Sequence, residues 1–149
     1  MSEPTDEFEE DNTLTPAFGQ AHPLKILLVE DDATNQQLFL TLFKELGYEV
    51  ELARDDVEAE NLISENAYQA IFMDIQLPGK TGLELIATTR KGGYGEANKT
   101  TFIIALTAFA LPEDKQRCYQ RGANAHLSKP FRLPALKEVL LKASSSYED

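Results

Sequence analysis

The sequence predicts an α/β fold in which five parallel strands alternate with helices in one doubly wound domain. Short apolar runs bounded by polar residues recur along the 149 residues, as in 26–29 and 102–106, and such runs are typical of buried strands. Helix-length segments separate the runs, which favours parallel strands joined by crossover helices. Most of the runs end in a charged or hydroxyl-bearing residue, a pattern that indicates a ligand site.

Five apolar runs are the expected strands: Leu24–Val29, Tyr48–Ala53, Gln69–Asp74, Thr101–Leu106 and Ala125–Ser128. The first helix follows the acidic run 30–32, and Gly47 is its expected end. The residues expected on its buried face are Leu38, Phe39, Leu42, Phe43 and Leu46.

The other helices are located by their caps. Asp55 and Thr81 are expected N-caps, Pro112 and Pro134 occupy first-turn positions, and Gly122 ends the fourth helix. The side chains expected to pack inward are Ala59, Leu62, Ile63, Leu83, Leu85, Ile86, Leu136, Val139 and Leu140. The loop 91–100 is rich in glycine, and it is expected either on the rim opposite the ligand site or beside the surface that contacts partners.

Charge divides the chain into parts. Residues 1–20 carry six acidic side chains and no Lys or Arg, so we expect residues 1–22 to be a disordered acidic leader or linker. The domain is placed at residues 23–143, and 144–149 form a C-terminal tail. A formal charge of −11 argues against a nucleic-acid partner.

The single cysteine, Cys118, excludes an internal disulfide and a cysteine metal site.

The chain has no apolar run of membrane-spanning length and no secretory h-region. We therefore expect a cytoplasmic protein without direct membrane contact.

Candidate site residues follow four of the predicted strands. Glu30 and Asp31 follow the first strand, Asp74 ends the third, and Thr107 and Lys129 follow the fourth and fifth. The carboxyl ends of parallel strands share one edge of a sheet, so these side chains should meet there. Clustered carboxylates beside one ammonium predict a divalent metal site that handles a phosphoryl group.

Four motifs in this order resemble the response-regulator receiver domains of two-component signalling. They are Leu27-Leu-Val-Glu-Asp-Asp32, Met73-Asp-Ile-Gln-Leu-Pro78, Ala105-Leu-Thr-Ala108 and Ser128-Lys-Pro-Phe131. The resemblance covers residues 24–142. It implies a flavodoxin-like sheet of order 2-1-3-4-5 and the transfer of phosphate from a phosphohistidine to an aspartate.

The resemblance implies a role for each matched residue. Asp74 would be the phospho-acceptor. Asp31 would bind Mg²⁺ directly, Glu30 would bind it through a water molecule, and Asp74 and the backbone carbonyl of Gln76 would complete the protein ligands. Lys129 would contact one phosphoryl oxygen.

The hydroxyl of Thr107 would contact another phosphoryl oxygen, and Ala108 would leave room for a phosphodonor. The family places a rotameric aromatic switch where this chain has His126. The peptide before Pro130 would be cis, and Asp32 would cap the first helix. Phe109 and Leu111 are candidates for an apolar contact regulated by phosphorylation.

The segments Val29-Glu-Asp-Asp-Ala-Thr-Asn-Gln36 and Met73-Asp-Ile-Gln-Leu-Pro78 resemble receivers of hybrid sensor histidine kinases more than those of transcription factors. We expect a receiver that exchanges phosphate with a histidine kinase or a histidine phosphotransfer domain and assists its own phosphotransfer and dephosphorylation. Its parent would be a histidine kinase, which could be membrane-bound. The alternative is a stand-alone response regulator that acts as a phosphorylation-switched binding module.

Three other classes fit less well. A flavodoxin-like cofactor carrier would need a phosphate-cradling loop after the first strand, where 30–32 would repel phosphate. A metal-dependent aspartyl-phosphate hydrolase would need a second acid at the position of Gln76. A purely structural module would be expected to have lost Asp31, Asp74 or Lys129.

Overall fold

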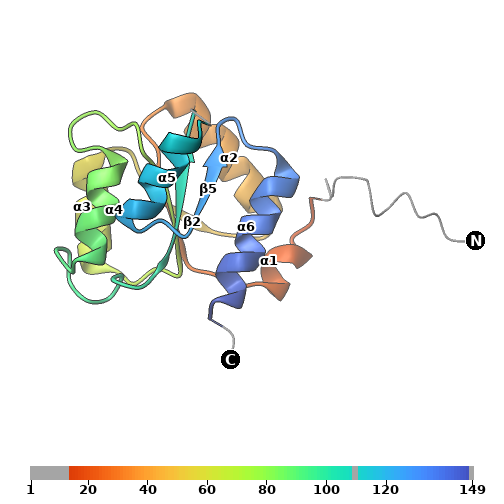
Figure 1. The fold of residues 1–149 in the computed structure, drawn as a ribbon. Helices are drawn as coiled ribbons and strands as arrows, with labels where there is room; N and C mark the ends of the chain where they lie inside the picture. Colours follow the sequence, from red (N-terminus) through yellow and green to blue (C-terminus); the bar gives the residue numbers. More distant parts are fainter. Residues whose placement is uncertain (1–13, 109–110, 148–149) are drawn as a thin grey trace, which may run out of the picture.

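The fold is known from a computed structural model that describes residues 14–108 and 111–147, and within these residues six helices enclose a five-stranded parallel sheet (Figure 1). The strand order is β2-β1-β3-β4-β5, which confirms the expected doubly wound fold. The strands are β1 (Ile26–Val29), β2 (Val50–Ala53), β3 (Ala70–Asp74), β4 (Phe102–Thr107) and β5 (Ala125–Ser128). The helices are α1 (Ala17–Ala21), α2 (Ala33–Glu45), α3 (Asp56–Glu65), α4 (Gly82–Arg90), α5 (Pro112–Arg121) and α6 (Leu133–Ser145).

Alternate residues of each strand point to opposite faces of the sheet, and each face has its own core. Leu28 and Phe72 pack with Phe43 of α2 and Leu140 of α6 on one face. The opposite face contains a second cluster under α3, α4 and α5, with these buried members among others: Leu27, Ile71, Ile63, Ile86 and Cys118. β1 and β3 are buried along their whole length because helices cover both faces.

Several strand boundaries differ from the prediction by one or two residues. β1 and β2 begin at Ile26 and Val50, because the parallel pairing of the sheet starts with these two residues. Leu24 and Tyr48 pack on the core without joining the ladder. β3 begins at Ala70 and β4 extends to Thr107, whereas β5 matches the prediction.

The helix caps follow the prediction closely. The side chain of Asp55 accepts a hydrogen bond from Glu58 N at 2.8 Å, and Thr81 forms a capping box with Glu84. Gly122 ends α5 in the left-handed conformation (φ 118°). Leu38 was expected in the core, and that prediction is wrong, because the side chain is 45% exposed.

Part of the expected disordered leader is ordered. Residues 1–13 lie outside the described residues, but α1 packs on the end of α2: Gly19 N donates to Leu46 O at 2.6 Å. The ring of Phe18 lies 6.3 Å from that of Tyr48, and the Tyr48 hydroxyl donates to His22 O at 2.7 Å. The prediction of disorder is therefore wrong for 17–21, since this segment buries an aromatic ring against the domain.

The expected C-terminal tail is also partly ordered. α6 continues to Ser145, and the Tyr147 hydroxyl donates to Gln69 O at 2.6 Å and lies 3.2 Å from Phe102 N, which donates to it. Tyr147 thereby attaches the end of α6 to the start of β4.

The glycine-rich loop after α4 lies at the amino end of the sheet, away from the strand ends that carry the predicted site. Asn98 fixes it there. Its amide nitrogen donates to Ile63 O and Asn66 O at 2.8 and 2.6 Å, and its amide oxygen accepts from Tyr68 N at 2.7 Å. None of the helices in the described ranges is both long enough and apolar enough to span a bilayer.

Candidate functional site

The parallel register gathers the predicted residues at the carboxyl edge of the sheet. Val29 is paired with Met73, so Glu30 follows β1 beside the end of β3, where Asp74 lies. Thr107 is paired with Ser128, and Lys129 comes next along the chain. The structure therefore brings the five residues Glu30, Asp31, Asp74, Thr107 and Lys129 to one edge.

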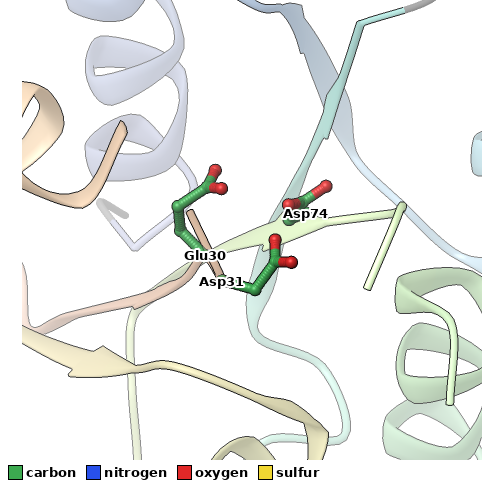
Figure 2. A group of neighbouring side chains, drawn as sticks. All are labelled: Glu30, Asp31 and Asp74. Carbon is green, nitrogen blue, oxygen red and sulfur yellow. The ribbon is translucent and has the colours of Figure 1, made fainter. Parts of the chain in front are cut away.

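Three carboxylates form the centre of this edge. Ligand oxygens of Glu30, Asp31 and Asp74 all lie within 4.8 Å of one another (Figure 2). The side chains of Glu30 and Asp74 are 0% and 1% exposed, whereas Asp31 is exposed. The cluster is buried at its base and open to solvent at Asp31.

Lys129 contributes a cation directly to the cluster. Its Nζ lies 3.2 Å from Glu30 Oε1 and 3.1 Å from Asp74 Oδ2, and the side chain is 13% exposed. The backbone N–H of Lys129 donates to Thr107 O at 2.7 Å, which fixes the start of the β5–α6 connection against β4. The peptide between Lys129 and Pro130 is cis, as the resemblance implied.

The site contains three carboxylates beside the ammonium of Lys129, and both burial and mutual repulsion shift their pKa values. Burial raises the pKa of Asp74, and the negative charge of Glu30 raises it further, against the opposing effects of the Gln76 N–H and of Lys129. Partial desolvation and the neighbouring Asp74 raise the pKa of Asp31. Burial tends to lower the pKa of Lys129, but Asp74 and Glu30 outweigh it, and the pKa is raised.

Asp74 is oriented by the loop that follows β3. The backbone N–H of Gln76 donates to Asp74 Oδ1 at 2.9 Å, so each carboxylate oxygen has one protein donor, Lys129 being the other. Behind Asp74, α4 begins with Gly82, where a Cβ would overlap the carbonyl oxygen of Asp74. A residue without a side chain is therefore required at the start of α4.

Glu30 is held from its own side of the site. Its Oε2 accepts a hydrogen bond from Asp32 N at 3.1 Å, and its carbonyl oxygen accepts from Gln36 Nε2 at 2.7 Å. Asp32 caps α2 by accepting from Thr34 N and Asn35 N, as predicted, and does not join the carboxylate cluster. The first turn of α2 therefore fixes the base of the acidic site.

The residues on the β4 side of the site differ in exposure. Thr107 is fully buried at the end of β4, and the small residue Ala108 beside it is exposed. Phe109, expected to carry a regulated apolar contact, lies outside the described residues. Leu111 precedes α5 and is 59% exposed.

His126 has a partner that the sequence did not indicate. Its Nδ1 lies 2.9 Å from the hydroxyl of Tyr119, and the two rings meet edge to face at 5.9 Å. Burial, followed by the charges of Lys115 and Lys142, lowers the pKa of His126. Tyr119 comes from α5 and His126 from β5, and no local motif links the two elements.

The donor set fits a hard divalent cation. Carboxylate oxygens are the ligands that Mg²⁺ prefers, and the exposure of Asp31 leaves space for water and phosphate oxygens in its coordination shell. Lys129 lies beside the same oxygens as a second positive charge. This arrangement can neutralise an incoming phosphoryl group next to a carboxylate.

The family comparison identifies the class of protein. Residues 26–141 match the response regulator receiver domain family, and the chain belongs to that family. It is therefore a receiver domain of two-component signalling.

Two relatives and two solved structures show what the chain is similar to. The sensor histidine kinase RcsC of Salmonella typhi is 37% identical over 117 residues, which are 78% of this chain and 12% of RcsC. The polar-differentiation response regulator DivK of Brucella anthropi is 36% identical over 118 residues, which are 79% of this chain and 94% of DivK.

Among solved structures, the receiver domain of a sensor histidine kinase from Pseudomonas aeruginosa, crystallised with a magnesium ion in its active-site cleft, has a TM-score of 0.74. It is 36% identical, and the match covers 82% of this chain and 98% of that one. The receiver of the Saccharomyces cerevisiae response regulator Ssk1, solved with the histidine phosphotransfer protein Ypd1, has a TM-score of 0.73 at 29% identity, over 82% and 89% of the chains.

Proposed function

We propose that this receiver accepts a phosphoryl group from a phosphohistidine onto Asp74, with Mg²⁺, and exchanges it with a histidine phosphotransfer partner. The observation that carries the proposal is the buried pair Glu30 and Asp74 sharing the single ammonium of Lys129. Two buried carboxylates with one cation are costly unless a further positive charge completes the site.

Each site residue has a role in this reaction. Asp31, Asp74 and the carbonyl of Gln76 would hold Mg²⁺, with Glu30 acting through a water molecule. When bound, Mg²⁺ neutralises the carboxylates and the phosphoryl oxygens. A carboxylate oxygen of Asp74 attacks phosphorus. An oxygen–phosphorus bond forms while the phosphorus–nitrogen bond to the donor histidine breaks.

Lys129 and Thr107 act on the transferred group. The ammonium of Lys129, already 3.1 Å from Asp74 Oδ2, balances the charge of one phosphoryl oxygen. The hydroxyl of Thr107 donates to another once phosphate is present, and His126 responds as the switch residue. We expect the face formed by α5, β5 and α6 to change most on phosphorylation.

The parent protein is proposed to be a hybrid sensor histidine kinase whose receiver lies in the cytoplasm. If the sensor is membrane-bound, the receiver is tethered to the membrane through it. The similarity to RcsC, a sensor histidine kinase, supports this context. The similarity to DivK over 94% of that protein favours the second candidate, a stand-alone response regulator. The Ypd1 complex of a similar receiver supports a histidine phosphotransfer partner.

The exposed Leu38 on α2 offers a test of the partner. It is 45% exposed and lies on the helix that begins at the acidic edge. Leu38→Glu should slow transfer to or from a histidine phosphotransfer domain and leave phosphate uptake from acetyl phosphate unchanged. If Leu38→Glu and the wild type exchange phosphate with the protein partner at the same rate, this face of α2 is not part of the contact.

The central experiment is incubation with Mg²⁺ and acetyl phosphate, followed by intact-mass analysis. The wild type should gain one phosphate, and Asp74→Asn should gain none. Lys129→Ala should weaken uptake, and Thr107→Ala should alter partner binding more than uptake. If Asp74→Asn gains as much phosphate as the wild type, the phospho-acceptor is a different residue.

A further inference from the structure

Three side chains from separate elements meet beside the acceptor loop, which comprises residues 75–81 between β3 and α4. Glu60 of α3 accepts two hydrogen bonds on its Oε2: one from Lys80 Nζ at 2.7 Å and one from the Tyr94 hydroxyl at 2.7 Å. Lys80 belongs to the acceptor loop, and Tyr94 belongs to the glycine-rich loop after α4. One carboxylate oxygen therefore connects α3 to both loops.

The two loops lie at opposite ends of α4, and each sends one side chain to Glu60: Lys80 from one loop and Tyr94 from the other. The acceptor loop precedes α4 at the carboxyl edge, whereas the glycine-rich loop follows α4 at the amino edge (Figure 1). Tyr94 stands on a tight turn in which Gly93 N donates to Thr88 O and Gly95 N to Gly92 O. Its ring packs on the core beneath α3 and α4.

The acceptor loop depends on few contacts. Gln76, Pro78, Gly79 and Lys80 are exposed, and Leu77 is its buried anchor. The loop is held to α3 through Lys80, whose backbone N–H donates to Asp56 Oδ2 at 3.1 Å and whose ammonium binds Glu60. The same loop carries the Gln76 N–H that orients Asp74 Oδ1.

The two hydrogen bonds to Glu60 also change its pKa. The hydrogen bonds from Lys80 and then Tyr94 lower the pKa of Glu60, which keeps it ionised. Lys80 alone would be a weak anchor, because its side chain is 50% exposed and such ion pairs contribute little. The Tyr94 hydroxyl fixes the carboxylate that Lys80 binds.

We propose that Glu60, with Tyr94, is a positioning residue for phosphoryl transfer: it latches the acceptor loop through Lys80 and so holds Gln76 against Asp74. This inference rests on the proposed function of Asp74. The latch does not touch the reacting atoms. Its effect reaches them through the three residues that separate Lys80 from Gln76.

Two variants remove the latch selectively. Tyr94→Phe removes only the hydroxyl and keeps the ring packed, and Glu60→Gln removes the charge that holds Lys80. Glu138→Gln is the matched control, because it weakens an exposed ion pair with Lys142 on α6 (3.7 Å), an element outside this latch. The readouts are amide hydrogen exchange and the rate of phosphate uptake from acetyl phosphate with Mg²⁺.

In both latch variants, amides 76–80 should exchange faster while β1 and β5 stay unchanged, and uptake should be about threefold slower, the scale of one weak polar contact. The double variant should be no slower than Glu60→Gln, because both act on one contact. Lys80→Arg should retain the wild-type rate, and Lys80→Met should match Glu60→Gln.

Unchanged exchange of 76–80 in both latch variants would overturn the proposal, as would slower uptake without faster exchange. Equal acceleration of exchange throughout the sheet would show general loosening instead of a latch, and would also overturn it. A wild type that takes up no phosphate would refute the proposed function, whereas the exchange result would still decide whether the latch holds the loop.

Discussion

At the carboxyl end of the sheet two buried carboxylates share one ammonium, whereas at the amino end the buried side chains of Asn98 and Thr101 are paired with neutral backbone groups. Glu30 and Asp74 are at most 1% exposed, and Lys129 is their cation. At the other end Asn98, 2% exposed, makes three hydrogen bonds to backbone groups. Thr101 donates to Tyr68 O at 2.6 Å.

The difference shows how one sheet serves two purposes. Paired neutral groups at the amino end cost little to bury and fix the loops there, so that end stabilises the fold. Excess negative charge at the carboxyl end opposes folding and would be relieved by a bound cation. Substitutions at the two ends should therefore have opposite effects on stability.

The largest effect is expected from Asn98→Ala at the amino end. It leaves Tyr68 N without its acceptor and two carbonyls without their donor, so the free energy of unfolding should fall by about 3 kcal/mol. Urea denaturation of the wild type and the variant measures this change. A loss below about 1 kcal/mol would mean that solvent replaces the amide.

The carboxyl end should respond in the opposite direction. Asp74→Asn removes a buried charge whose pKa is raised by burial and by Glu30, so the metal-free protein should gain about 1–2 kcal/mol in the free energy of unfolding. Asp31→Asn should gain less, because Asp31 is exposed. Millimolar Mg²⁺ should raise the melting temperature of the wild type more than that of Asp74→Asn. A destabilised Asp74→Asn variant would contradict the comparison.

The gain from Asp74→Asn should depend on pH. A carboxyl whose pKa is higher in the folded than in the unfolded state binds more protons when folded, so its cost is complete above the folded pKa and disappears below the unfolded value of about 3.8. The stability difference between Asp74→Asn and the wild type should therefore be greatest near neutral pH and shrink towards pH 4. Chemical denaturation at several pH values, without Mg²⁺, measures this stability difference. A difference that grows on acidification would mean that folding lowers the pKa of Asp74, which contradicts the prediction.

The smallest effect is expected from Tyr147→Phe. Its hydroxyl pairs with Gln69 O and Phe102 N, but the residue is 44% exposed, and water can replace the hydroxyl. We expect a loss of about 0.5–1 kcal/mol in urea denaturation and no change in phosphate uptake. A loss as large as that of Asn98→Ala would show that the end of α6 is a principal support of the sheet.

The sheet and most of the acidic site could be predicted because both follow from strand periodicity and parallel topology. Once the apolar runs are strands, Glu30, Asp74 and Lys129 must share an edge. Leu38 was misplaced because the apolar residues of α2 cover more of its circumference than the core does, and Phe39 and Phe43 occupy the buried face.

The remaining features depend on packing that no local pattern reveals. α1 has five residues, too few for periodicity, and it docks through the backbone contact of Gly19 with Leu46. The Glu60–Tyr94 contact joins residues 34 apart, and Tyr119 meets His126 across a turn. Only the tertiary structure brings these side chains together.

Gly82 has a consequence for how the sequence can vary. Its Cα lies so close behind the Asp74 backbone that even a methyl group would have to displace the carbonyl oxygen of Asp74. In a library of all single substitutions selected for signalling, position 82 should be depleted as strongly as position 74, although Gly82 has no side chain to contribute to the chemistry. Tolerance to mutation around Asp74 should thus depend on the space available to the backbone as well as on the reactive groups.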